Sequence, residues 1–354
     1  MTAQEAHIRA DDRLLAAIGN TPMESVDLRI DGRWRDIRLK LEGANPFGSI
    51  KDRTALSLLT DLEDRDRLTA ESVLIESTSG NLGVALAGLA RIRHYRFMAV
   101  VDPKVTAENL ARMQSLGAAV EVVGEADENG CYLASRLRRV RDLCAVSPHF
   151  AWTDQYSNPA NPRAHYTGTG PEIGRQAGPK LDAIFIPVST GGTLAGIGRY
   201  LRKARPATRI VAVDALGSVI FGGRPRRRRL TGIGSDRRSN FVRRSLYDEH
   251  MLVDDATAFV LCRMLARGTG IRVGGSSGAV LAACARYLQV HPAVRNVVCV
   301  CPDDGSHYAT TIFDDGWISG QQVKRPCGSH LPVTGIRPGP GGRVPAPAAD
   351  PWRT

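Results

Sequence analysis

The stretch SVLIESTSGNLGVALAGLARIRHYRFMAVV, Ser72 to Val101, is the part of the sequence that best indicates the fold. It begins with a short apolar run, passes through small polar residues, continues with apolar residues at helical spacing and ends in a second β-branched run. A strand, a loop, a helix and a second strand in this order predict a βαβ unit, in which the two strands are parallel.

The same alternation of strand and helix continues along the chain. Further strands are expected at 118–123, 182–188, 209–215 and 294–301, and further helices at 106–117, 131–144 and 193–204. With 354 residues the chain is long for one sheet, so we expect the α/β class with two packed domains and parallel sheets. The last segment is rich in Pro and Gly, which predicts a disordered tail over 326–354.

The composition is typical of a soluble globular protein, with 43% hydrophobic and 23% charged residues. No apolar run reaches the roughly 18 residues that span a bilayer, and the polar N-terminus lacks a signal core, so we expect a cytoplasmic protein. Seven cysteines without regular spacing fit a reducing compartment. Cys299 and Cys301 lie in an apolar run, and we interpret them as buried residues on one face of a strand rather than metal ligands.

The net charge of +11 leaves a nucleic-acid partner open, but the basic residues are spread along the chain. The one dense run is RPRRRR, Arg224 to Arg229. We interpret it as a solvated loop, with the rim of a site for an anionic substrate as a second interpretation and nucleic-acid binding as a third. No zinc-finger spacing, aromatic RNA-binding motif or heptad repeat accompanies it.

A second stretch, GANPFGSIKDRTALSLL, Gly43 to Leu59, places a lysine at an unfavourable position. A Gly- and Pro-rich turn leads through Ser49 into a helix whose second residue is Lys51. The positive end of the helix dipole destabilises an ammonium group there. Together with burial, this dipole would depress the pKa of the amine, which suits a nucleophile or a general base.

Three loops join expected strands to expected helices, where open α/β sheets bind their ligands. ESTSGNLG, Glu76 to Gly83, offers hydroxyl and N–H groups suited to a carboxylate. VSTGGTLAG, Val188 to Gly196, has paired glycines that let the backbone approach a phosphate. VGGSSGAVLAA, Val273 to Ala283, brings serines to a helix start. Each loop taken alone is also compatible with an ordinary capped turn.

A lysine and these three loops together are what pyridoxal phosphate requires. Its aldehyde needs a lysine, its phosphate a Gly- and Thr-rich helix start, and its ring nitrogen a partner. A serine partner leaves the ring neutral, which favours β-elimination and replacement over transamination. Asp214, at the end of an expected strand, keeps a nicotinamide-binding alternative open, although neither the G-x-G-x-x-G fingerprint nor the P-loop is present.

Four motifs in order resemble the cysteine synthase and cystathionine β-synthase family of fold-type II pyridoxal-phosphate enzymes: NPFGSIKDR, STSGNLGVALA, STGGTLAGIGRYL and GGSSGAV. DQYSNPANPRAHYTGTGPEI and CPDDGSHYATTIFDDGW are similar to further family segments, so the resemblance extends from about Leu14 to Trp317. It implies a tryptophan synthase β-like fold of two three-layer α/β domains, usually in a homodimer. Residues 1–52 and 156–325 would form the large cofactor-binding domain, and 53–155 a small mobile one.

The resemblance also implies a role for individual residues. Lys51 forms the Schiff base with the cofactor and later acts as the catalytic base. Asn81 contacts the phenolic oxygen of the cofactor and Ser276 its ring nitrogen. The residues for the cofactor phosphate are Ser189, Thr190, Gly191, Gly192 and Thr193, and those for the substrate α-carboxylate are Thr78, Ser79, Gly80 and Gln155. The implied reaction is β-replacement, in which a β-substituted alanine loses its substituent to give α-aminoacrylate and a nucleophile then adds at Cβ.

Departures from common cysteine synthases bear on the substrates. Ser189 stands where they have Gly, Tyr156 where they have Phe, and the polar segment SDRRS, Ser235 to Ser239, is additional. These features resemble a branch that joins O-phospho-L-serine to L-glutamate on the route to 2,3-diaminopropionate, a precursor of siderophores and peptide antibiotics. Both substrates are anionic, and Arg237 and Arg238 are candidates to bind them.

Two other functions stay open. One is a cysteine synthase that uses O-acetylserine or O-phosphoserine with sulfide. The other is a catalytically silent relative that acts as a binding or regulatory subunit, against which the retained Lys51 argues. Phe47, where relatives often have a smaller residue, would narrow the mouth of the site.

Overall fold

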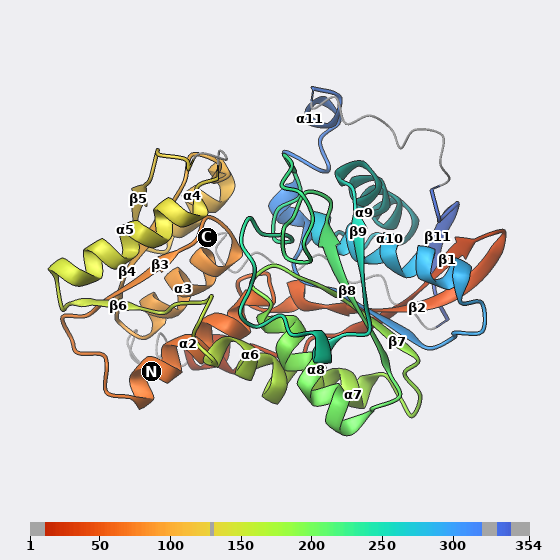
Figure 1. The fold of residues 1–354 in the computed structure, drawn as a ribbon, viewed down its shortest axis with the longest axis horizontal. Coiled ribbons are helices and arrows are strands. Elements are labelled where there is room, and N and C mark those ends of the chain that lie inside the picture. The colour runs from red at the N-terminus through yellow and green to blue at the C-terminus, as the bar shows by residue number, and fades with distance from the viewer. Residues whose placement is uncertain (1–10, 128–130, 321–330, 341–354) are drawn as a thin grey trace, which may run out of the picture.

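The computed structural model describes residues 11–127, 131–320 and 331–340 and contains two β-sheets. Figure 1 shows the two sheets side by side, the four-stranded sheet on the left and the seven-stranded sheet on the right, each with helices packed around it. No helix within the described ranges is long and apolar enough to cross a membrane.

The four-stranded sheet has the strand order β5–β4–β3–β6, and all neighbouring strands are parallel. Its strands are β3 (Val73–Ser77), β4 (Arg96–Val101), β5 (Ala119–Val122) and β6 (Phe150–Trp152). Its helices are α2 (Lys51–Asp64), α3 (Asn81–Ile92), α4 (Ala107–Ser115) and α5 (Leu133–Val146). Because strand side chains alternate between faces, Leu74 packs in the core with α2, α3 and α4, whereas Ile75 packs with α5.

The seven-stranded sheet has the order β11–β1–β2–β10–β7–β8–β9. Its strands are β1 (Met23–Ile30), β2 (Arg33–Leu41), β7 (Ala183–Pro187), β8 (Arg209–Ala215), β9 (Glu249–Val253), β10 (Val297–Cys301) and β11 (Gly335–Pro338). Its helices are α7 (Gly170–Gln176), α8 (Gly192–Ala204), α9 (Asp255–Thr269) and α10 (Gly275–Val290). Phe185 packs with α9 and α10, whereas Ile184 packs with α7 and α8 on the opposite face.

Short elements complete the described chain. They are a helical segment at residues 11–16, α6 (Ala160–Ala164), a π-helical turn (His165–Thr169), α11 (Asp315–Gly320) and single 3₁₀ turns at Glu42–Ala44, Arg244–Leu246 and Gly305–Tyr308. Each sheet is therefore covered on both faces, and the predicted α/β class with three-layer packing is confirmed. The predicted strand, helix and strand over 72–101 are β3, α3 and β4.

The expectation of parallel sheets is correct only in part, because β1 is antiparallel to both β2 and β11. Asp31 and Gly32 join β1 to β2 with positive φ angles of 48° and 77°. An Asp-Gly pair in this conformation makes a tight hairpin turn whose twist matches that of the strands. The two strands carry many polar residues and form no continuous apolar run, so the sequence pattern does not mark them as buried strands.

The prediction of a disordered tail over 326–354 is wrong for residues 331–340. Gly335–Pro338 pair with β1 as the edge strand β11. Ile336 packs against the main core, and Arg337 lies 2.9 Å from Asp27 and over the ring of Trp34. The Pro that ends the strand is tolerated because it lies at the sheet edge. Residues 326–330 and 341–354 lie outside the described ranges.

Cys299 and Cys301 are fully buried on β10 and belong to the core on the α9 and α10 side of the sheet. The interpretation of these cysteines as buried residues on one face of a strand is therefore confirmed. In the part of the chain that the structure describes, no group of three His, Cys, Asp or Glu side chains is arranged to hold a metal ion.

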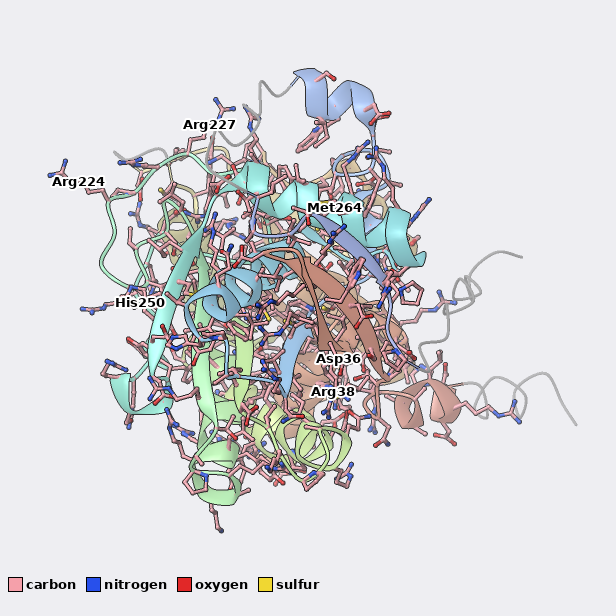
Figure 2. All side chains as sticks on the ribbon, turned by 90° about the vertical axis from the view of Figure 1, so that its right-hand side faces the viewer. Asp36, Arg38, Arg224, Arg227, His250 and Met264 are labelled. Carbon is pink, nitrogen blue, oxygen red and sulfur yellow. The ribbon has the colours of Figure 1, made fainter. Side chains whose placement is uncertain are left out.

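The Arg224–Arg229 run divides into two parts. Arg224 and Arg227 are exposed, and Figure 2 shows both extending away from the surface. Arg228 is half-buried and its Nη1 lies 2.7 Å from Asp236 Oδ1. The exposed part agrees with a solvated loop. Arg228, by contrast, forms an ion pair with Asp236 and so holds the segment at residues 235–239, which contains Arg237, against the run.

Candidate active site

Lys51 is the first residue of α2, one position closer to the helix start than the sequence predicts. Asp52 Oδ2 accepts a hydrogen bond from Phe47 N at 2.6 Å, which closes the preceding turn. Ile50 N donates to Pro302 O at 2.7 Å and attaches this turn to the segment after β10. The lysine backbone is therefore fixed from both sides.

The Lys51 side chain is half-buried, and among the described residues its Nζ has no hydrogen-bond or ion-pair partner. Burial lowers the pKa of the ammonium group from 10.5 to about 8, against the opposing effect of the Glu76 carboxylate. The start of α2 acts in the same direction as burial. A substantial fraction of the amine is thus neutral at mildly alkaline pH, as a nucleophile or base requires.

A buried ion-pair cluster lies beneath the start of α2. Arg53 Nε is 2.7 Å from Glu42 Oε2, and Arg53 Nη1 is 2.6 Å from Glu172 Oε1. Lys40 Nζ is 2.6 Å from Glu172 Oε2. Removing one partner from such a cluster leaves a buried charge unpaired, at a cost of about 3–5 kcal/mol. The cluster fastens the lysine-bearing helix to β2 and α7.

The loop between β3 and α3 places residues 78–80 at the start of a 12-residue helix. Thr78 Oγ1 accepts a hydrogen bond from Gly83 N at 3.1 Å, which shapes the loop. Gln155, on the segment after β6, lies beside it, and its Nε2 donates to Ser77 O at 3.1 Å. The structure therefore brings together the four residues that the sequence assigned to a carboxylate.

Glu76, fully buried at the end of β3, joins this loop to the segment after β6. Its Oε2 accepts hydrogen bonds from Thr153 Oγ1 at 2.6 Å and from Gln155 N at 3.0 Å, and its Oε1 accepts one from Ser77 N at 2.8 Å. Burial raises the pKa of the carboxyl group to about 7, although these hydrogen bonds oppose the shift. The sequence reasoning gave Glu76 no role, because its partners become visible only in three dimensions.

The loop between β7 and α8 has the geometry of an anion site. Gly191 precedes the helix with a φ of 86°, and a Cβ atom on Gly192 would overlap the side-chain oxygen of Asn161. Asn161 Nδ2 also donates to Thr190 Oγ1 at 3.2 Å. The first N–H groups of the 13-residue helix α8 therefore lie beside a loop of fixed shape.

Two further hydroxyl groups of this loop have defined partners. Ser189 Oγ donates to Gly234 O at 3.1 Å, which links the loop to the segment before residues 235–239. Thr193 Oγ1 lies 3.4 Å from Nε2 of His165, a buried histidine of the π-helical turn. The five residues predicted to bind a phosphate are thus contiguous and held by separate parts of the chain.

Ser276 and Asn81 lie at the starts of α10 and α3 respectively. The buried Ser276 Oγ has no hydrogen-bond partner among the described residues. Asn81 Nδ2 donates to Asp303 Oδ2 at 2.8 Å, and Asp303 also accepts a hydrogen bond from Tyr308. Burial raises the pKa of Asp303 to about 6. Asp303 stands in one of the family-like motifs, but sequence reasoning gave it no role.

The candidates for the second substrate lie less close together. Arg237 lies over the ring of Tyr156, with 5.9 Å between its guanidinium carbon and the ring centre. Burial raises the pKa of the Tyr156 phenol to about 12, while the nearby Arg136 and Arg237 oppose this shift. Arg136 is buried and 3.1 Å from Asp102, and no motif marked it in the sequence. Arg238 is exposed, and the structure does not bring it to Tyr156.

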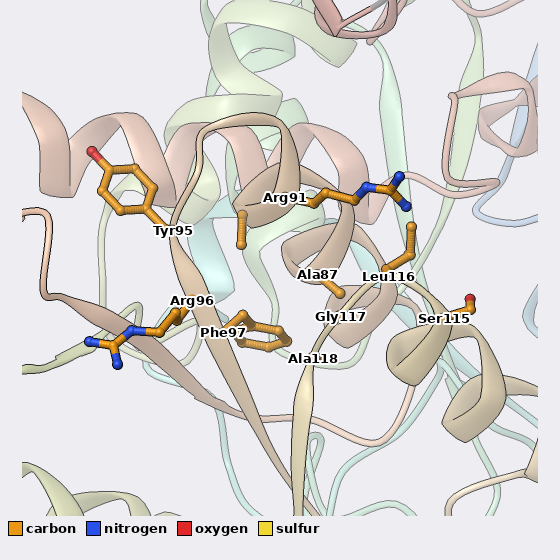
Figure 3. A pocket seen from close by; sticks show the side chains of 10 residues that line it. Ala87, Arg91, Tyr95, Arg96, Phe97, Ser115, Leu116, Gly117 and Ala118 are labelled. Atoms are coloured by element: carbon orange, nitrogen blue, oxygen red, sulfur yellow. The ribbon is translucent and has the colours of Figure 1, made fainter. Parts of the chain in front are cut away.

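A shallow pocket of about 380 Å³ lies elsewhere, between α3, α4 and the start of β4. Figure 3 shows Arg91 and Arg96 at this pocket with their guanidinium groups pointing away from each other. The pocket lies at the N-terminal end of β4, whereas the loops described above follow the C-terminal ends of their strands. Because ligands of open α/β sheets bind at the C-terminal ends, we assign the active site to the loops.

A lysine at a helix start, with glycine- and hydroxyl-rich loops at the starts of α3, α8 and α10 in two α/β units, is typical of a pyridoxal-phosphate enzyme of fold type II. The family model described as "Pyridoxal-phosphate dependent enzyme" matches residues 14–303, and the chain belongs to this family. Its cofactor is therefore pyridoxal phosphate. The residues fit this group, because Lys51 Nζ and Ser276 Oγ lack partners within the described residues and no side chain caps the N-terminus of α8.

Named relatives narrow the class. Proteins called N-(2-amino-2-carboxyethyl)-L-glutamate synthase from Ralstonia nicotianae and Cupriavidus metallidurans are each 40% identical over 316 residues, covering 89% and 88% of this chain and 94% and 92% of theirs. The structure of O-ureido-L-serine synthase is similar with a TM-score of 0.77 and 31% identity, over 86% of this chain and 98% of that one. An O-acetylserine dependent cystathionine beta-synthase from Helicobacter pylori has the same TM-score and identity, over 84% and 97%. The protein is a β-substitution enzyme of the cysteine synthase-like group.

Proposed function

We propose that the enzyme converts O-phospho-L-serine and L-glutamate to N-(2-amino-2-carboxyethyl)-L-glutamate and phosphate. The amine nitrogen of glutamate forms a bond to Cβ of phosphoserine, the Cβ–O bond breaks, and phosphate leaves with the bonding electrons. The observation that carries this proposal is the 40% identity, over about nine-tenths of the chain, to the relatives that bear this name. Two guanidinium groups near Tyr156 support anionic substrates.

In this proposal the cofactor is attached to Lys51 Nζ, and residues 189–193 with the start of α8 hold its phosphate. Asn81 and Ser276 contact its ring. When bound, pyridoxal phosphate draws electrons away from Cα of the substrate. Lys51, freed when the substrate amine takes its place, would take the Cα proton and return it to Cα after the glutamate nitrogen has added, for which its pKa of about 8 is well suited.

The substrate α-carboxylate is held at the start of α3. The hydroxyl groups of Thr78 and Ser79, the backbone of Gly80 and the amide of Gln155 supply donors there. The positive end of the helix adds a favourable charge. Glu76 accepts hydrogen bonds from Ser77 N in the loop and from Gln155 N. These two bonds fix the positions of the donors relative to one another.

The leaving phosphate and the carboxylates of glutamate require further positive charge in the site. Arg136 and Arg237 are our candidates, because both lie within electrostatic range of Tyr156. Arginine suits this role because its planar fork binds phosphate and carboxylate with two hydrogen bonds. Arg238, exposed one residue further on, is assigned to the rim, where it attracts incoming anions.

The family resemblance supports three further proposals. The enzyme is a homodimer, residues 53–155 form a small domain that moves relative to 1–52 and 156–325, and the product serves 2,3-diaminopropionate synthesis for siderophores or antibiotics. The strands of the four-stranded sheet all lie between residues 73 and 152, within the range proposed to move. The cytoplasmic location stays a prediction from the sequence.

The alternative is a cysteine synthase that adds sulfide to O-acetylserine or O-phosphoserine. To separate the two functions, the purified holoenzyme is incubated with O-phospho-L-serine, and phosphate release is measured with glutamate or sulfide as the second substrate. We expect release that depends on glutamate and a product with the mass of the adduct. Cysteine formation with sulfide and no adduct with glutamate would overturn the proposal.

A further inference from the structure

The buried carboxylate of Asp303 lies between two helix starts, one belonging to each sheet. On one side, its Oδ2 accepts a hydrogen bond from Nδ2 of Asn81, the first residue of α3. On the other side, a Cβ atom on Gly274, the residue before α10, would overlap Asp303 Oδ1. The carboxylate therefore occupies the space that the missing side chain of Gly274 leaves at the N-terminus of α10.

Asp303 is also part of the segment that fixes the lysine. Its backbone pairs with Ser49 in an isolated β-bridge, and the residue before it accepts the hydrogen bond from Ile50 N. One residue thus touches the turn before Lys51, the start of α3 and the start of α10.

Polar atoms near Asp303 are left without partners. Asp303 is 2% exposed and Ser276 is 1% exposed, and both Asp303 Oδ1 and Ser276 Oγ lack a hydrogen-bond partner among the described residues. Buried polar atoms are rarely left unsatisfied in folded proteins. Both atoms lie at the start of α10, and the unpartnered Ser276 Oγ indicates that a bound group completes this part of the site.

The bond to Asp303 determines how the Asn81 amide is oriented. A carboxylate can only accept hydrogen bonds, so it requires the NH₂ end of the amide to point toward it. An amide NH₂ group has two protons, and Asp303 engages one of them. The second proton then remains available to another acceptor. With its pKa near 6, Asp303 is ionised at neutral pH and keeps this orientation.

We propose that Asp303 is a positioning residue that orients the Asn81 amide toward the phenolic oxygen of the cofactor and holds the start of α3 against the lysine turn. Its role rests on the cofactor, which the family establishes, and not on the identity of the two substrates. If the enzyme proves to use other substrates, the role of Asp303 is unaffected. If Asp303 proves to have no such role, the proposed reaction is unaffected.

The test measures binding of pyridoxal phosphate to the apoenzyme without substrate, followed by the visible absorbance of the complex. Asp303→Asn keeps the size of the side chain but removes its charge, and its amide can turn either its oxygen or its NH₂ group toward Asn81, so the orientation of the Asn81 amide is no longer imposed. We expect about a tenfold weaker affinity and a shifted absorbance band. Tyr308→Phe removes the other donor to Asp303, at 2.6 Å, and should have a much smaller effect. Asp214→Asn, at a second buried aspartate with an unpartnered oxygen, is the matched control.

A double-mutant cycle separates positioning from general stabilisation. If Asp303 acts through Asn81, Asp303→Asn should change nothing further in the Asn81→Ala background. Additive losses, or an Asp303→Asn variant with unchanged affinity and spectrum, would overturn the proposal. If Asp303→Asn does not fold, Asp303→Glu keeps the charge but moves the oxygen away from Asn81. It should also bind the cofactor more weakly, and wild-type affinity would count against the proposal.

Discussion

The phosphate loop and the region around Tyr156 differ in how firmly the fold holds them. In the loop at residues 189–193, Gly192 fits only without a side chain, and Ser189 and Thr190 bond to distant segments. Near Tyr156, the guanidinium carbon of Arg237 lies 5.9 Å from the ring centre, and Arg238 is exposed. The cofactor side is preorganised, whereas the substrate side retains freedom to adapt to what it binds. This contrast fits a family that keeps one cofactor and varies its substrates.

The largest expected effect is on the cofactor side. Lys51→Ala removes both the point of covalent attachment and the catalytic base, so turnover should fall by at least about 10³-fold. The visible absorbance of the bound cofactor should change as well. Lys104→Ala, at an exposed lysine near Tyr132, serves as the control and should retain both. Persistent turnover in Lys51→Ala would show that another residue is the base.

The next prediction tests the preorganised loop itself. Gly192→Ala places a methyl group against Asn161 Oδ1, and relieving this overlap should cost about 1–3 kcal/mol. We expect the affinity for pyridoxal phosphate to fall by about 10- to 100-fold. Gly124→Ala is the control, because a Cβ atom there meets nothing within 4 Å. An unchanged affinity in Gly192→Ala would mean that the loop is not rigid.

A smaller effect is expected on the substrate side. Arg237→Ala should raise KM for O-phospho-L-serine by about tenfold, since a hydrogen bond to a charged group contributes about 1.5–3 kcal/mol. KM for O-acetylserine, which lacks the phosphate charge, should change little, and so should cofactor affinity. Arg224→Ala changes an exposed arginine of the nearby run and is the control. Equal changes for both substrates would remove Arg237 from phosphate recognition.

The smallest effect is a pH dependence. Because burial lowers the pKa of Lys51 from 10.5 to about 8, the neutral amine becomes the major form above about pH 8. The rate at which the apoenzyme attaches pyridoxal phosphate should therefore rise with pH and level off near this value. Stopped-flow absorbance from pH 6 to 10 measures it. A rise that continues toward pH 10 would contradict the depressed pKa.

The same contrast explains what the sequence could predict. The β3–α3–β4 unit and the start of α2, to within one residue of Lys51, follow from local periodicity and from residues close in sequence. The phosphate loop follows from its paired glycines, because a position with positive φ such as Gly191 admits few other residue types. These features belong to the cofactor side of the site, which the fold holds firmly.

The features that the sequence did not show depend on distant partners. Strand β11 forms because Ile336 and Arg337 pair with residues of β1 that lie about 310 positions earlier in the sequence. Arg136 and Asp303 gain their positions from Asp102 and Asn81, and neither pairing leaves a periodic signal. The Asp31–Gly32 hairpin did carry a turn signal, but the polar strands on either side concealed it.

One measurement tests the central claim most directly. The holoenzyme is given O-phospho-L-serine together with ¹⁵N-labelled L-glutamate and an equal concentration of sulfide, and the products are identified by mass spectrometry. The account predicts a single major product that carries the ¹⁵N label, formed in equal amount to the released phosphate. Cysteine as the major product, with no label in any adduct, would contradict it.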